Sequence, residues 1–297
     1  MHKQTRLGII IINWNSYETT YRCVSELSGW EINRTVYVVD NGSSNNEASK
    51  LQTDFPWCEV IQANRNLGYS GANNLGIRQA LKDECSHFFL LNNDASISEK
   101  SVILLIEACD QDSSAAIAGP VIKDGPEGRV LNAGGRDIAR HDITHLQEVR
   151  DSSRSYSVDY VSGTAVLFKA DCIRQNGYLD EDYFFSGEIA DFCKRLAKTG
   201  KLSKTIICPQ ATTFHYPEMA GTNRNAIYNY YIVRNRYLYL KKHHRMRFDL
   251  YFLWMFRHLK HAWASKTRYK DGSTRWILAG LRDGLTGNYG PHSSSIG

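Results

Sequence analysis

The first 120 residues alternate between short apolar runs and segments with helical periodicity. The apolar runs are rich in Ile, Val and Phe and have the length of buried strands. They cover residues 6–14, 35–40, 58–63, 87–92 and 115–122. The helical segments between them cover residues 17–27, the stretch after the turn at 41–46, 70–82 and 99–109. Strands separated by helices predict right-handed βαβ units and a mostly parallel sheet.

The second half of the chain is less regular until its last third. Residues 121–157 are polar and glycine-rich, which predicts loops and short strands, and strand composition returns at 158–170. A helical pattern over 187–200 ends on Gly200, a typical C-cap residue, and a further strand is expected at 201–209.

Beyond Asn225 the pattern is helical to about Leu285. We therefore expect an α/β domain over residues 1–223, with halves at 1–120 and 121–223, and a helical extension over 224–297.

Composition and cysteine usage indicate a soluble protein of a reducing compartment. The formal net charge is +5, with 42% hydrophobic and 23% charged residues, which is ordinary for a globular chain. The seven cysteines form no CxxC pair, which predicts buried free thiols. The sequence shows no signal peptide and no run of ~18–20 apolar residues. We expect a cytoplasmic protein, with peripheral contact at the inner face of the membrane as a further expectation.

Polar side chains follow each of the first four predicted strands. These strand ends are residues 13–15, 40–43, 64–68 and 92–94, and amides and carboxylates dominate them. In open α/β sheets, ligands bind outside the carboxyl ends of the strands. Polar loops are common in any protein, but four such ends in succession favour a binding site over generic solvated turns.

The strand ends lack the two common phosphate-binding motifs. No GxGxxG follows the first strand and no GxxxxGK[ST] occurs, which disfavours dinucleotide dehydrogenases and P-loop phosphotransferases. Asn92 and Asp94 are one residue apart at a strand end, where both side chains can point to the same side. Oxygen ligands of this kind suit a hard divalent cation that also binds phosphate. An N-cap or Asx-turn before the next helix explains Asp94 equally well.

Several motifs in order resemble family 2 glycosyltransferases of the GT-A fold, particularly bacterial rhamnosyltransferase-like members. The resemblance covers residues 6 to about 240. Its motifs are "IIIINWNS" (9–16), "VYVVDNGSSN" (36–45), "ANRNLGYSGANNLGI" (63–77), "FFLLNNDA" (88–95), "VSGTAVLFKAD" (161–171), "GYLDEDYFFSGEIADFCKRLAKTG" (177–200) and "HYPEMAGT" (215–222). The end "ILAGLRDGLTGNYG" (277–290) also resembles these enzymes.

The resemblance implies a Rossmann-like nucleotide-binding sheet that binds a nucleotide-sugar donor. Asn13 and Asp40 would contact the base and ribose, and Ser162 and Gly163 would lie near the donor sugar. The other implied donor-binding positions are Asn15, Asn41, Asn66, Gly68, Asn73, Asn92 and Asn93.

The resemblance also implies a Mg²⁺ or Mn²⁺ site. Asn92-Asn93-Asp94 occupies the family's DXD position, with Asn in place of the first Asp, so Asp94 is the expected metal ligand. His215 matches a family histidine near the metal and the diphosphate. Its alternative is an ordinary surface or core histidine.

Two carboxylates are candidates for the general base that sugar transfer requires. Glu188 and Asp191 lie three residues apart on one predicted helix face. An ion pair between Asp191 and Arg195, four residues on, is also expected, which leaves Glu188 at the helix start as the favoured base. The commoner family pattern is Glu-Asp-Val-Asp, and Ile189 replaces the Asp often assigned as base.

The leading hypothesis is an inverting glycosyltransferase that moves L-rhamnose from dTDP-L-rhamnose to a polysaccharide or lipid-linked glycan acceptor. A UDP-hexose enzyme is the nearest alternative, and Ile189 motivates a second class, a non-catalytic sugar-nucleotide or glycan-binding protein. Basic residues with interleaved aromatics within residues 224–260 fit a membrane-surface helix near a lipid-linked acceptor, or a solvated helix face. A nucleic-acid binder ranks last because it leaves the strand ends unused. The oligomeric state stays open, with a homo-oligomer among the expectations.

Overall fold

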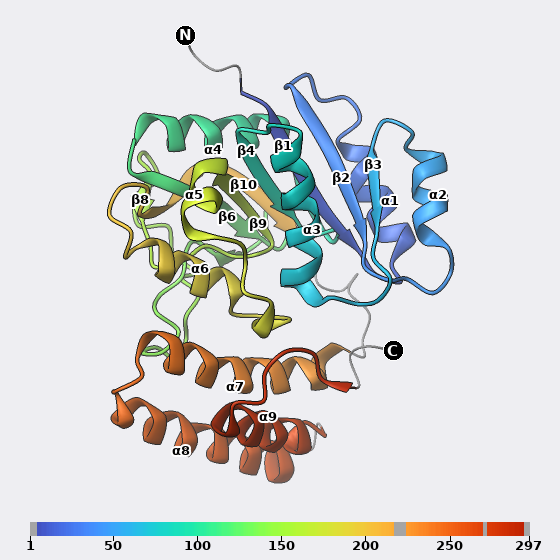
Figure 1. Cartoon of the computed structure of the whole chain (residues 1–297). Coiled ribbons are helices and arrows are strands. Elements are labelled where there is room, and N and C mark those ends of the chain that lie inside the picture. Colours follow the sequence, from blue (N-terminus) through green and yellow to red (C-terminus); the bar gives the residue numbers. More distant parts are fainter. Residues whose placement is uncertain (1–4, 217–223, 270–271, 294–297) are drawn as a thin grey trace.

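The computed structural model describes residues 5–216, 224–269 and 272–293, and Figure 1 shows their arrangement. A ten-stranded sheet forms the centre, in the order β3-β2-β1-β4-β9-β6-β10-β5, with β7 beside β6 and β8 beside β10. The strands are β1 (Leu7–Asn13), β2 (Arg34–Asp40), β3 (Glu59–Gln62), β4 (His87–Leu91), β5 (Ala95–Ile97), β6 (Ala115–Lys123), β7 (Val130–Asn132), β8 (Tyr156–Ser157), β9 (Ala165–Lys169) and β10 (Lys204–His215).

Six strands of the sheet point the same way. Strands β1, β2, β3 and β4 pair in parallel, and β6 and β10 also pair in parallel. Strand β9 runs antiparallel between β4 and β6, so β6 keeps the direction of β4. The N-terminal end of β9 therefore lies at the same sheet edge as the carboxyl ends of β1, β2 and β4.

Helices cover both faces of the sheet because residues of the strands alternate between two cores. Ile9 and Ile11 of β1 pack on the face covered by α1 (Tyr17–Glu26), α2 (Glu47–Asp54) and α4 (Glu99–Gln111), whereas Ile10 packs on the other. Helices α3 (Gly68–Lys82), α5 (Ala170–Asn176) and α6 (Glu188–Leu196) cover that second face, and η1 (Glu181–Tyr183) is a short 3₁₀ turn before α6.

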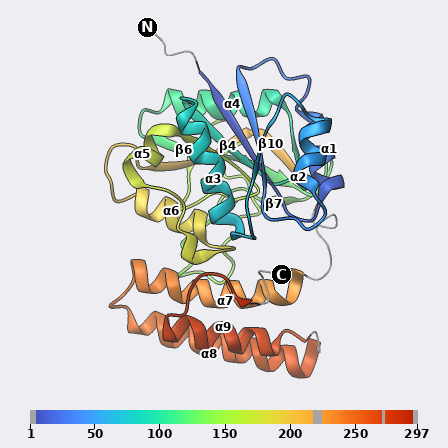
Figure 2. The ribbon, with the colours of Figure 1, turned by 45° about the vertical axis from the view of Figure 1, so that its right-hand side comes forward.

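The C-terminal helices form a further layer against one end of the α/β unit (Figures 1 and 2). They are α7 (Arg224–His243), α8 (Phe248–Ala264) and α9 (Thr274–Thr286), with a π-helical segment, Ser265–Tyr269, after α8. Tyr237 of α7, Trp254 of α8 and Ile277 of α9 belong to the same buried core as Phe192 of α6. This continuity makes the C-terminal layer an integral part of the packed structure.

The structure confirms the expected α/β class and the mostly parallel sheet, and it shifts several elements. The strand expected at 158–170 is confined to β9, and α5 follows it where no helix was predicted. The helix expected over 187–200 ends at Leu196, and the strand expected at 201–209 extends to His215. The expected boundary at 223 lies outside the described residues.

Two further expectations concern the thiols and the membrane. All seven cysteines are buried and free, as predicted. Within the described ranges, no helix is both long and apolar enough to span a bilayer.

Candidate active site

The ends of β1 and β2 are joined by a buried hydrogen-bond network around Asn13. The Asn13 amide donates to Asp40 Oδ2 (2.9 Å) and Glu47 Oε2 (2.8 Å), and its carbonyl accepts from the Thr20 hydroxyl (2.7 Å). Asn13 and Thr20 are fully buried and Asp40 nearly so. The network ties both strands to α1 and α2, so it fixes the shape of the sheet edge where the donor nucleotide is expected.

The loop after β2 is held by a second set of amides. Asn15 Oδ1 accepts from the Ser44 backbone N–H and hydroxyl, both at 2.9 Å. Asn41 donates to Asn66 Oδ1 (2.9 Å), which also accepts from the Gly68 N–H (2.8 Å). These contacts bring the ends of β1, β2 and β3 together, as the sequence predicted.

Gly68 and Asn73 belong to the start of α3. Gly68 has φ +71°, and a Cβ atom there would lie 2.3 Å from the Phe184 carbonyl oxygen, so only glycine fits. Asn73 is buried and its amide donates to the Tyr69 carbonyl at 3.0 Å. Both positions therefore shape the edge through close packing.

The segment before β9 joins the same edge. The Asn92 N–H donates to the Thr164 carbonyl at 2.9 Å, and the Asn93 amide donates to the Thr20 hydroxyl at 2.9 Å. Ser162 donates to the Thr164 hydroxyl at 3.1 Å. The expected donor-sugar position around Ser162 and Gly163 is thus adjacent to the DXD-like segment.

Asp94 has the features of a metal ligand. Its side chain is buried, its Oδ1 accepts no hydrogen bond, and His215 Nε2 lies 3.4 Å from that oxygen. Two backbone contacts keep Asp94 and His215 close together. Strand β10 pairs with β5, and the Tyr216 N–H donates to the Asp94 carbonyl at 2.9 Å. Asp94 is not the N-cap of the helix that follows. Ser98 caps α4, because its side chain accepts a hydrogen bond from the Ser101 N–H.

The Asp94 and His215 pair fits a divalent cation that is completed by its substrate. In the described part of the chain, no group of three or more His, Cys, Asp or Glu is arranged to hold a metal. Mg²⁺-type sites commonly use one or two protein ligands together with substrate phosphate oxygens and water. An orphaned buried carboxylate oxygen costs free energy unless a cation or donor meets it.

Glu188 begins α6 after a strained turn. Phe184 and Ser186 have φ of +57° and +70°, a region that non-glycine residues rarely adopt, and Gly187 has φ +99°. Burial, together with the nearby Asp191 charge, raises the pKa of Glu188 to about 7. Backbone hydrogen bonds to the carboxylate lower the pKa and offset part of this rise. Glu188 Oε2 is buried and accepts no hydrogen bond.

Asp191 is in the opposite situation, because its oxygens are fully engaged. It is completely buried, with Arg195 Nε 2.8 Å from Oδ2 and His243 Nε2 2.8 Å from Oδ1. Burial alone would raise its pKa, but the hydrogen bonds from His243 and Arg195 lower the pKa below its usual value. The predicted Asp191–Arg195 pair is confirmed, and the geometry favours a structural role for Asp191.

Helix α7 holds the turn that presents Glu188. The Asn235 amide donates to the carbonyls of Tyr183, Phe185 and Ser186 at 2.9, 2.8 and 2.5 Å. Arg234 donates to the Asp182 and Tyr183 carbonyls, both at 2.8 Å. Both side chains are buried, so the C-terminal layer fixes the start of α6.

A chain of contacts links Glu188 to the strand ends. The Tyr69 hydroxyl donates to the Gly163 carbonyl at 2.6 Å, and burial together with the Glu188 charge raises the pKa of Tyr69. A Cβ on Gly163 would lie 3.4 Å from Ile189 Cγ1, so Gly163 and Ile189 are close neighbours. Glu188 therefore borders the expected donor-sugar position.

Several residues of this site were not predicted from the sequence. No sequence pattern singled out these five residues, which are Thr20, Glu47, Tyr69, Asn235 and His243. Tyr69 lies inside the quoted segment at 63–77, and only its neighbours were singled out. The other four act across distances in sequence that no local pattern reports.

Comparison with known proteins first defines the fold class. The structure of mannosyltransferase PcManGT from Pyrobaculum calidifontis, in complex with GDP-Man and Mn²⁺, matches with a TM-score of 0.62 at 12% identity. The match covers 97% of this chain and 89% of that one, and the shared fold is GT-A.

Sequence comparison then gives the family. The model of Glycosyl transferase family 2 matches residues 8–176, so the chain belongs to this family and is a glycosyltransferase. The low-salt glycan biosynthesis hexosyltransferase Agl10 of Haloferax volcanii is 29% identical, over 78% of this chain and 74% of its own. The dTDP-rhamnosyl transferase RfbF of Shigella flexneri is 27% identical, over 79% of this chain and 80% of its own.

Replacing Asp94 with Asn should remove metal-dependent ligand binding while leaving the fold intact. The amide keeps the shape but loses the charge that attracts the cation. At a cation concentration about 100 times its dissociation constant, binding stabilises the native state by about 2.7 kcal/mol, and the variant should lose most of this. The measurement is the thermal shift produced by a nucleoside diphosphate with and without Mn²⁺. The control is Asp110→Asn, on α4, whose Oδ1 lies 3.7 Å from Nε2 of His87 at the start of β4. An unchanged Mn²⁺ effect in Asp94→Asn would remove Asp94 from the site.

Replacing Asn235 with Ala should lower kcat by ~10-fold to ~100-fold, because a small displacement of a catalytic group is costly. Nucleotide binding should persist, since strands β1 to β4 hold that pocket. Asn132→Ala removes another buried amide, on β7, and is the control. Comparing the kcat values of the two variants at the same folded fraction separates a positioning role of Asn235 from general destabilisation. Equal kcat values in the two variants would contradict the assigned role of Asn235.

Proposed function

We propose that this glycosyltransferase inverts the donor anomeric centre and transfers L-rhamnose from dTDP-L-rhamnose to a glycan or lipid-linked glycan acceptor. The similarity to a dTDP-rhamnosyl transferase over most of both chains supports the choice of donor. The polar strand ends support a nucleotide pocket in the N-terminal half. A UDP-hexose donor is the alternative, and the similarity to a hexosyltransferase is compatible with either donor.

One observation carries the proposal. Among the carboxylates discussed for this sheet edge, Asp94 and Glu188 each keep a buried oxygen without a hydrogen-bond partner. Asp40, Glu47 and Asp191 instead accept hydrogen bonds from neighbouring side chains. A buried carboxylate oxygen without a hydrogen-bond partner destabilises the folded protein, and one on each of these residues suits a site whose partners arrive with the substrate.

Each unsatisfied carboxylate has a separate role in the proposal. Asp94 and His215 would hold Mg²⁺ or Mn²⁺, which supplies positive charge to the leaving diphosphate. Glu188 would accept the proton of the acceptor hydroxyl as that oxygen bonds to the anomeric carbon and the bond to the diphosphate breaks. Burial prepares Glu188 for this task, because a base with a pKa near 7 is efficient at neutral pH.

The side chains around Glu188 would orient this reaction. Tyr69 is near the Glu188 charge and donates to the Gly163 carbonyl, and Thr164, next to Gly163, accepts from the Asn92 N–H, so Tyr69 and Gly163 would border the sugar ring. Asn13, Asp40 and Asn41 would bound the base and ribose, with their side chains fixed by the networks described above. Such fixed dipoles need little rearrangement when the substrate binds.

The donor is tested by a turnover panel with dTDP-L-rhamnose, UDP-glucose and UDP-galactose in the presence of Mn²⁺. We expect donor consumption, by transfer or by slow hydrolysis, to be fastest with dTDP-L-rhamnose. A clear preference for a UDP-hexose would replace the proposed donor and leave the reaction type unchanged. Binding of a donor with no consumption of any of them would support the non-catalytic class that Ile189 motivates.

Glu188→Gln should mainly lower activity, whereas Asp191→Asn should mainly lower stability. Glu188→Gln should abolish the rise of kcat/KM through an apparent pKa of about 7 and lower turnover by ~100-fold or more. Asp191→Asn should instead destabilise the protein by about 3 kcal/mol, because it disrupts a buried ion pair. Turnover against pH and urea unfolding measure the two effects.

The pH dependence of unfolding provides an independent control. Because the folded pKa of Glu188 is raised above its ordinary value, the folded state holds the proton more tightly than the unfolded state. Its contribution to stability is therefore lost as pH rises from about 4.5 to about 7. Glu188→Gln should be at least as stable as the wild type above this window. A larger loss of turnover in Asp191→Asn than in Glu188→Gln, at matched folded fraction, would exchange the two roles.

A further inference from the structure

The outer surface of α8 carries a continuous row of exposed apolar side chains, here called the α8 stripe. Its members are spaced by three or four residues and therefore lie on one helix face. They are Phe248, Phe252, Phe256, Leu259 and Trp263, which are 61%, 66%, 68%, 46% and 68% exposed. Such an exposed row on a soluble surface marks an interaction site.

Packing among the residues that the structure describes does not account for the α8 stripe. The buried positions of α8 are Leu250, Trp254, His258 and Ala262, which form a separate face. Trp254 Nε1 donates to the Ala139 carbonyl at 2.7 Å, and the Arg236 guanidinium lies 3.7 Å from the Trp254 ring centroid. This inner face anchors α8, so the opposite face is available for a partner.

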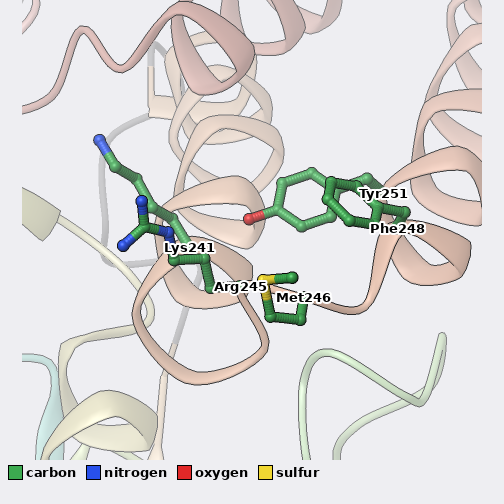
Figure 3. A pocket seen from close by; sticks show the side chains of 5 residues that line it. All are labelled: Lys241, Arg245, Met246, Phe248 and Tyr251. Carbon is green, nitrogen blue, oxygen red and sulfur yellow. The ribbon is translucent and has the colours of Figure 1, made fainter.

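The surroundings of the α8 stripe are strongly basic. Residues 241–268 contain eight Lys or Arg and one Asp. The start of α8 lies beside a hollow lined by Lys241, Arg245, Met246, Phe248 and Tyr251, where cationic and apolar side chains adjoin (Figure 3). Lys260 and Arg268 extend the exposed positive charge toward the other end of α8.

Only the later part of the expected basic and aromatic region at 224–260 contributes to this surface, and its first part, residues 224–247, does not. This first part folds as α7 and the following turn, and its Tyr230, Tyr237, Arg234 and Arg236 are buried. Helix α7 lies between the α/β unit and α8, whereas α8 and α9 form the outermost layer (Figures 1 and 2). The exposed aromatic and basic character belongs to α8 and its flanking residues.

We propose that the α8 stripe docks onto the interfacial region of a membrane that contains anionic lipids. Aromatic and aliphatic side chains on one face, with Lys and Arg around them, are the pattern of helices that lie in the plane of a membrane surface. Positive residues near anionic headgroups add electrostatic attraction. A second copy of the chain is the disfavoured occupant, because a symmetric contact through the stripe would bring the same basic residues together. The proposal does not depend on the donor or the catalytic base.

Vesicle co-sedimentation of the full chain tests this surface. Wild-type protein should pellet with phosphatidylcholine vesicles that contain phosphatidylglycerol, and about ten-fold less with pure phosphatidylcholine. Phe252→Ser combined with Phe256→Ser should weaken binding to the anionic vesicles by ten-fold or more, because the inserted apolar surface is lost. Trp57→Ser removes an exposed aromatic ring from the N-terminal half and should leave binding unchanged.

Two results would overturn the proposal. The first is equal vesicle binding by the wild type and the Phe252/Phe256 variant, or no binding by either. The second is a wild-type dimer in sedimentation velocity that the same two substitutions dissociate, which would assign the α8 stripe to a second copy. Circular dichroism and nucleotide thermal shifts confirm that the variants are folded, and both should match the wild type because the substituted side chains are exposed.

Discussion

The turn at residues 183–187 is the constraint on which the candidate site depends. Its left-handed Phe184 and Ser186 each cost about 1–3 kcal/mol, so the turn persists only if its surroundings hold it. Asn235 and Arg234 of α7 bind its carbonyls from one side, and the Tyr69 N–H bonds the Phe184 carbonyl at 2.6 Å from the other. The position of Glu188 therefore results from contacts among three segments that are distant in sequence.

The contacts that α7 makes with this turn tie the C-terminal helices to the candidate site. His243, the last residue of α7, lies within hydrogen-bond distance of Asp191, whose charge is one helical turn beyond Glu188. If that charge were unpaired, it would repel the Glu188 carboxylate and further raise its pKa. The layer that carries the proposed membrane surface thus also sets the electrostatics of the proposed base. In this arrangement α8 carries the proposed membrane surface, and α7 supports the candidate site.

The sequence predicted the N-terminal half well because its signals are local. Apolar runs ending on Asn13, Asp40 and Asn92 define both the strands and the polar edge, and parallel pairing brings these ends together. Strand β9 was expected as a strand, but its antiparallel insertion depends on pairing that no local pattern encodes. The sequence could not decide between Glu188 and Asp191 for a similar reason. The contact that occupies Asp191 comes from His243, which is 52 residues away along the chain. Helix α7 was misjudged as a surface because Tyr and Arg are compatible with exposure, and only the layers on both sides bury them.

The account rests on the claim that Asp94 and Glu188 are left unsatisfied so that the substrate and its cation can complete them. The most direct test is a crystal structure with Mn²⁺ and a nucleoside diphosphate, using anomalous scattering to locate the metal. The account predicts Mn²⁺ bound to Asp94 and the diphosphate, with the nucleotide along the ends of β1 and β2 and Glu188 facing the vacant sugar position. A nucleotide bound elsewhere, or Mn²⁺ bound without Asp94, would contradict it.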